Sequence, residues 1–166
     1  MFCVQKNERN YDIKIIGALL LKTVVLITCT RQKHKGIHEA EYLYSASPNF
    51  VRYLSSARSI VDDSDIFIVS ALHHLVPLHK TIEDYDCALT ERTVQEQFAW
   101  GELVAKELSE IYDLDKTRFI VIADDDYCSA LLPYLKHMDK PLNGVGCGPA
   151  GYEQLDSFLA TQRRSV

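Results

Sequence analysis

Side chains with useful chemistry follow three short apolar segments of this chain, residues 24–27, 66–69 and 118–122. They comprise a thiol, an amine, hydroxyls, imidazoles and carboxylates: Cys29, Thr30 and Lys33 after the first segment, Ser70, His73 and His74 after the second, and Asp124, Asp125 and Asp126 after the third. β-Branched apolar runs of this length are typical of parallel strands buried on both faces. Because ligands bind beyond the carboxyl ends of such strands, we expect a pocket at this edge of the sheet.

Cys29 and Lys33 each allow two interpretations. The Cys29 thiolate can act as a nucleophile, helped by the cations of Lys33 and Arg31. Alternatively, Cys29 is a small apolar plug at a strand end, which is the interpretation that the sequence favours. Lys33 is equally compatible with a point charge that holds a phosphate or carboxylate and with a solvated lysine in a basic loop.

His73 is the candidate general acid or base, because the pKa of a free imidazole lies near neutral pH. A structural histidine is the commoner role for any single histidine. The side chains of His73 and His74 point in different directions, and the chain has no His-Glu-x-x-His spacing. We therefore expect no metal site.

The three aspartates and a glycine-rich turn complete the set of candidates. The aspartates can hold Mg²⁺ or a ribose hydroxyl, but we expect Asp125 or Asp126 to cap the next helix. Gly144 and Gly146 can let backbone amides reach an anion at the start of the last helix. Ordinary turn formation explains these glycines equally well.

Helical patterns separate the apolar segments. Ser47 and Pro48 predict a helix start. The expected helices cover residues 49–60, 91–111, 127–137 and 152–163, residues 70–77 form a loop or short helical turn, and residues 141–145 form a fourth strand. Alternating strands and helices predict an α/β fold, a three-layer Rossmann-like sandwich with a small, mainly parallel sheet. We expect one α/β domain over residues 21–166 and an N-terminal extension over residues 1–20.

Composition narrows the functional classes. The 166 residues carry 18 basic and 23 acidic side chains, a net charge of −5, which argues against a general nucleic-acid coat but not against a small anion-binding pocket. Five cysteines without a Cys-x-x-Cys pair favour a reducing, cytoplasmic location. The apolar stretch over residues 13–27 is interrupted by lysines and is too short to span a bilayer.

Five motifs occur in order along the chain: CTxxK at 29–33, LYSxSPxF at 43–50, SALHHLVP at 70–77, IxxYD at 82–86 and PLxGxG at 141–146. This series resembles an uncharacterised bacterial and phage family of small α/β proteins, over residues 24–160. The third motif is distantly similar to the peroxide-stress DNA-binding family. The first is distantly similar to the core of archaeosine synthase, which modifies a deazaguanine base in transfer RNA. His74 and Asp84 stand where the resembled pattern has glycine and proline.

The resemblance implies an enzyme that acts on a nucleobase or nucleotide, by base modification or by glycosidic-bond chemistry as in an N-glycosidase. Its implied catalytic residues are Cys29, His73 and Tyr85, and its implied substrate- or anion-binding residues are Thr30, Lys33, Tyr44, Ser70, Gly144 and Gly146. No cofactor is expected, and the expected partner is a small molecule containing a nucleobase. The alternative is a non-enzymatic nucleic-acid-binding or phage accessory regulatory protein, for which the basic loop at 31–38 is the supporting feature.

Overall fold

A five-stranded sheet, in the order β4-β3-β1-β6-β7, forms the centre of the computed structural model, which describes residues 21–144 and 149–163. Its strands are β1 (Lys22–Thr28), β3 (Ile66–Ser70), β4 (His74–Pro77), β6 (Thr117–Ile122) and β7 (Met138–Asp139). β1 pairs in parallel with β3 and β6, and β7 pairs in parallel with β6, whereas β4 is antiparallel to β3. The expected mixed α/β fold with a mainly parallel sheet is therefore confirmed.

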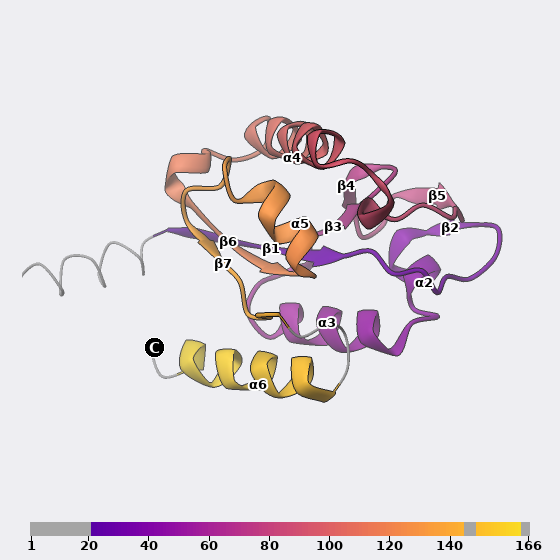
Figure 1. Cartoon of the computed structure of the whole chain (residues 1–166). Helices are drawn as coiled ribbons and strands as arrows, with labels where there is room; N and C mark the ends of the chain where they lie inside the picture. The colour runs from indigo at the N-terminus through magenta and orange to yellow at the C-terminus, as the bar shows by residue number, and fades with distance from the viewer. Residues whose placement is uncertain (1–20, 145–148, 164–166) are drawn as a thin grey trace, which may run out of the picture.

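Helices cover both faces of this sheet (Figure 1). The helices are α2 (Ala40–Tyr44), α3 (Pro48–Arg58), α4 (Val94–Ser109), α5 (Asp125–Leu131) and α6 (Pro149–Arg163). Val24 and Leu26 pack with α4 and α5 on one face, while Val25 and Ile27 pack with α3 and α6 on the other. β1 is therefore buried on both sides, which explains its unbroken apolar run.

Local sequence signals fix where two helices begin. The Ser47 hydroxyl accepts a hydrogen bond from the Phe50 amide at 3.5 Å, so α3 starts at Pro48 as predicted. The α4 helix starts at Val94 rather than at residue 91, because Thr93 and Glu96 form a reciprocal capping box. The preceding residues instead form a short 3₁₀ helix, η2 (Leu89–Glu91).

The segment after β6 departs from prediction in three ways. The N-cap of α5 is Asp124, not Asp125 or Asp126, and its side chain makes no capping bond. The helix ends at Leu131 rather than near residue 137, because Pro133 cannot donate the next backbone hydrogen bond. The chain consequently reaches the sheet edge early, and β7 replaces the strand expected at 141–145.

Residues 70–77 form a hairpin rather than the expected loop or helical turn. Ser70 pairs with His74, and β4 runs back along β3. His74 has a φ of 58°, a left-handed conformation that non-glycine residues seldom adopt. The position at which the resembled pattern has glycine thus keeps a glycine-like backbone, although histidine occupies it.

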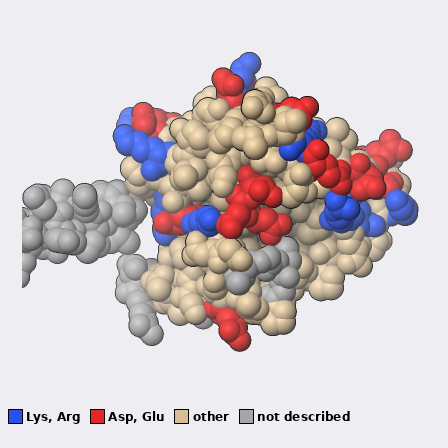
Figure 2. All heavy atoms as spheres, in the orientation of Figure 1, with Lys and Arg blue, Asp and Glu red and all other residues tan. Residues whose placement is uncertain are grey.

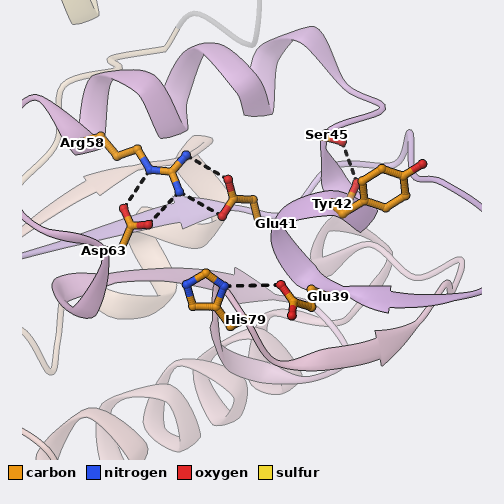
Figure 3. Close-up of polar contacts among 7 residues, drawn as sticks. All are labelled: Glu39, Glu41, Tyr42, Ser45, Arg58, Asp63 and His79. Carbon is orange, nitrogen blue, oxygen red and sulfur yellow. Dashed lines mark hydrogen bonds and ion pairs between the residues drawn. The ribbon is translucent and has the colours of Figure 1, made fainter.

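A second, two-stranded sheet pairs β2 (Ile37–Glu39) with β5 (Thr81–Glu83), and the sequence pattern does not reveal it. Ion pairs attach the neighbouring α2 to the main body (Figure 3). The guanidinium group of Arg58, on α3, bonds Glu41 at 2.9 Å and Asp63 at 2.7 Å, and it lowers the pKa of the Asp63 carboxyl. Together with the burial of Leu43 and Tyr44, these bonds fix the position of α2.

Residues 1–20, where we expected an N-terminal extension, lie outside the described residues. In the part of the chain that the structure describes, no helix combines the length and apolar character needed to cross a membrane.

Gly101 lets α4 approach α5 at very short range. A Cβ atom placed on Gly101 would lie 2.0 Å from the carbonyl oxygen of Ala130 and 2.7 Å from its carbonyl carbon. Because the obstacle is helix backbone rather than a flexible side chain, the two helices would have to separate.

We expect Gly101→Ala to lower the free energy of unfolding by about 1–3 kcal/mol, measured by urea denaturation, because the new methyl group overpacks this contact. The exposed neighbour Glu102→Ala is the matched control, with an expected change within about 0.5 kcal/mol. An increase in stability for Gly101→Ala, as in a free helix, would contradict the close approach.

Candidate functional site

A pocket of about 350 Å³ opens at the carboxyl ends of β1 and β6. Four segments line it, and their lining residues are Cys29, Thr30, Arg31 and Gln32 after β1, Ser47 and Asn49 at the start of α3, Cys87 to Thr90 at η2, and Asp124 and Tyr127 at the start of α5. Two thiols, four hydroxyls and a carboxylate thus border one space. This hollow lies at the edge of the sheet where the sequence predicts a ligand pocket, and binding of a ligand there stays a prediction.

The topology explains why the crevice forms at this place. After β1 the chain crosses to β3 through α3, on one face of the sheet. After β3 it crosses through α4, on the other face, to reach β6. β1 and β6 are neighbours, so the segments leaving them diverge to opposite faces (Figure 1). A strand order that reverses in this way leaves an open crevice between the two strand ends.

Cys29 lines this crevice and is half-buried. Its backbone amide donates to the carbonyl oxygen of Val69 at 3.0 Å, which extends the ladder between β1 and β3. Its Sγ atom lies 3.2 Å from the hydroxyl oxygen of Tyr127. Burial raises the pKa of Tyr127, so its hydroxyl keeps its proton and can donate it in a hydrogen bond to a thiolate.

Two tyrosines and a serine form a hydroxyl network beside the pocket. The Tyr85 oxygen lies 2.7 Å from that of Tyr44 and 2.6 Å from Oγ of Ser70. The Ser70 Oγ atom also accepts hydrogen bonds from the amides of Leu72 and His73, so its own proton points to Tyr85. Tyr44 is fully buried, and burial raises the pKa of both tyrosines. Tyr44, Ser70 and Tyr85 are thus bonded to one another and are not among the residues that line the pocket.

Lys33 lies over this network and is half-buried. Its ammonium nitrogen is 4.4 Å from the ring centroid of Tyr85 and 5.8 Å from that of Tyr44, within the range of cation–π attraction. It also donates to the Arg31 carbonyl at 3.4 Å. Burial lowers the pKa of Lys33, and the nearby Cys29 and Asp86 partly oppose this effect. The ammonium is thus held over the tyrosine rings rather than freely solvated.

Of the other predicted residues, His73 contacts Tyr85 and Thr30 lines the pocket. His73 packs edge-on against the Tyr85 ring, with centroids 5.2 Å apart, and burial lowers the pKa of its imidazole. Thr30 lines the pocket and donates to the Gln32 carbonyl at 3.0 Å. The basic loop is largely neutralised, because Arg31 pairs with Glu91 at 2.5 Å and Lys35 pairs with Asp84 at 2.9 Å.

A second pocket of about 270 Å³ adjoins the first and shares Thr90 and Asp124 with it. Asp125, Asp126 and Gly144 also line it, and Gly144 has a φ of 64°. Acidic side chains gather near the middle of this face, in the region of α5 (Figure 2). Among the described residues, no group of three or more histidine, cysteine or acidic side chains is placed to hold a metal ion. Gly146 lies outside the described residues.

Some participants in the site escape sequence reasoning. Tyr127 contacts Cys29, and Cys87 and Asn49 line the same pocket, yet each comes from a different part of the chain. Tyr127 has a usable signal, because it lies in the first turn of the helix that follows a strand end. Cys87 and Asn49 have none, since only the crossovers bring residue 49 and residue 87 to the end of β1.

Three comparisons with known proteins add one finding. A family model described as "Family of unknown function (DUF6884)" matches residues 24–155. This span contains every described residue of both pockets. No curated protein and no solved structure matches the chain.

We expect Lys33→Met to slow alkylation of Cys29 by iodoacetamide at pH 7 by up to about tenfold, because the thiolate is the reacting form and a nearby cation favours it. Peptide mass spectrometry measures the rate at Cys29 alone. Lys33→Arg keeps the charge and should retain most of the rate, and Lys106→Met, on the exposed side of α4, is the matched control. Equal rates for Lys33→Met and the native chain would show that Lys33 does not act on this thiol.

Proposed function

The chain belongs to the DUF6884 family of unknown function, so we propose its activity from the pocket itself: an enzyme that acts on a nucleobase or nucleotide, by modifying the base or cleaving its glycosidic bond. The observation that carries the proposal is the half-buried Cys29 thiol, which contacts the Tyr127 hydroxyl and lines a pocket at the carboxyl ends of β1 and β6.

The proposed architecture is a small Rossmann-like three-layer sandwich. The connections that follow β1 and β6 lead to opposite faces of the sheet, and this supports the proposed architecture. In sheets of this kind, nucleotide ligands bind in the crevice between two such strand ends. The volume of about 350 Å³ lies near the lower end of the range for small-molecule sites. A single base or nucleoside suits that volume better than a dinucleotide does.

Cys29 is the proposed nucleophile. Its thiolate attacks an electron-poor ring carbon, an S–C bond forms, and the electron pair of the ring C=N bond moves onto the nitrogen. That nitrogen takes up the proton that the thiol lost, so the net step is addition of a thiol across C=N. The Tyr127 hydroxyl holds the sulfur in place before attack. Lys33, whose ammonium lies over the Tyr85 ring, is the proposed cation beside this step.

The lining also offers groups for recognition. The hydroxyls of Thr30 and Thr90 and the amide of Gln32 border the pocket, and all three can bond the edge of a base. Arg31 lines the pocket but is paired with Glu91. Lys33, the proposed cation for an anionic group of the ligand, lies outside the lining residues, over the Tyr85 ring. Tyr44 and Tyr85 are proposed to position Lys33 rather than to stack on a base, because their hydroxyls are engaged with each other and with Ser70.

A nucleic-acid-binding role is the weaker proposal. It depends on the basic loop at 31–38, where Arg31 and Lys35 are both paired with carboxylates. On the face seen in Figure 2, lysine and arginine side chains lie beside acidic ones. Polymer binding depends on unpaired cations that displace counterions from phosphates.

The test is isothermal titration calorimetry with nucleobases, nucleosides, nucleoside monophosphates and single- and double-stranded oligonucleotides. We expect a base-containing small molecule to bind with one-to-one stoichiometry. Thr30→Val and Tyr127→Phe should each weaken binding by about tenfold, since each removes a hydroxyl from the pocket. Cys29→Ala should keep binding and abolish turnover.

Tyr134→Phe is the control for Tyr127→Phe, because it removes an exposed hydroxyl that lies outside the pocket lining. Salt-dependent binding of oligonucleotides alone would favour the nucleic-acid-binding role instead. Binding that both pocket variants leave unchanged would place the ligand elsewhere and remove the proposal.

A further inference from the structure

Two free thiols line the same pocket. Cys29 follows β1, and Cys87 lies between β5 and η2, in a stretch without helix or strand. Both are half-buried, and both pack against the apolar cluster beneath α4 and α5. The function proposed above uses only Cys29, so the presence of Cys87 at the same pocket is unexplained by it.

Cations accompany both sulfur atoms. The Nη2 atom of Arg92 donates to Sγ of Cys87 at 3.6 Å. Burial lowers the pKa of the Lys33 ammonium, and the charges of Cys29 and Cys87 are among the influences that oppose this lowering. Positive charge next to a thiol favours the reactive thiolate form.

Cys128 differs from these two thiols, because it is fully buried. It is 1% exposed, and its thiol donates to the carbonyl oxygen of Ala123 at 3.5 Å. Burial raises its pKa to about 12. A thiol in that state does not compete in exchange reactions.

We propose that Cys29 and Cys87 form a thiol–disulfide exchange site that reacts with low-molecular-weight disulfides of the glutathione type and ends as a disulfide across the pocket. The Cys29 thiolate attacks one sulfur of glutathione disulfide, and the first glutathione leaves as a thiolate. The Cys87 thiolate then attacks Sγ of Cys29, and the second glutathione leaves. Two protein thiols and one glutathione disulfide thus give one protein disulfide and two molecules of glutathione.

The two backbones contribute unequally to closure. Cys29 is anchored to β3 through its amide bond to Val69. A disulfide needs Cα atoms about 4.4–6.8 Å apart. Because Tyr85 is held by its bonds to Tyr44 and Ser70, we expect residues 86–88 to supply the movement that closure needs. The resulting bridge occupies the space in which a ligand would lie. The exchange itself does not depend on what that ligand is.

The test uses the full chain with Cys3→Ser and Cys147→Ser, so that only the described cysteines remain. After incubation with glutathione disulfide under native conditions, intact-mass and peptide-mass spectrometry locate the bonds. We expect the loss of two free thiols, a mass lower by two hydrogen atoms and a peptide linking Cys29 to Cys87. Cys128 should remain a free thiol, and dithiothreitol should restore the other two.

Further variants make the outcome decisive. In a Cys87→Ser chain, the reaction should stop with one glutathione attached to Cys29, and in a Cys29→Ser chain with one attached to Cys87. Circular dichroism confirms that each variant is folded. Two stable glutathione adducts on the same chain, a bond from either thiol to Cys128, or no consumption of thiols would each overturn the proposal.

Discussion

Burial of β1 on both faces is the constraint from which the rest of this structure follows. From residue 24 to residue 28 the strand exposes almost no surface, since α4 and α5 cover one face and α3 and α6 the other. β3 and β6 flank it along its edges. The amino end of the strand, at Lys22, reaches solvent, whereas its carboxyl end is buried as far as Thr28. Cys29 is the first residue beyond this end, and it is partly accessible. The thiol therefore directly follows a strand that is buried on both faces.

A network of three hydroxyl groups links the end of β3 to Tyr85 and Tyr44. Ser70 ends β3, accepts the amides of the following turn and contacts Tyr85, which in turn contacts Tyr44. The ring of Trp100 also donates to the Ser70 carbonyl at 2.9 Å, which ties α4 to the same point. The ammonium of Lys33 lies over the Tyr85 ring. One serine thus links the left-handed turn at His74 to the position of the cation.

The sequence predicted what depends on local pattern and strand burial. The strands at residues 24–27, 66–69 and 118–122 and the start of α3 at Pro48 are as expected, because apolar runs and capping residues determine them locally. The hairpin strand β4 was missed, since its turn needs a left-handed residue and His74 gives no such signal. β2 and β5 were missed because three-residue strands form only through their pairing.

The residues of the candidate site also fall into those that local sequence predicts and those that only the tertiary structure brings together. Cys29 and Thr30 follow a strand end, and the structure places both in the pocket. Tyr44, Tyr85, Ser70 and Lys33 gather beside it, in contacts between residues far apart in the chain that no spacing encodes. Cys87 and Asn49 reach the pocket only through the crossovers. Strand ends therefore located the pocket, whereas its far walls required the tertiary structure.

The central claim is that a base-containing ligand occupies the space above Cys29. Its most direct test is the rate of Cys29 alkylation by iodoacetamide, followed by peptide mass spectrometry with and without saturating adenosine, guanosine, cytidine or uridine. The account predicts that at least one nucleoside slows the reaction at Cys29, and that Thr30→Val weakens this protection. Unchanged alkylation of Cys29 in the presence of all four nucleosides would contradict it.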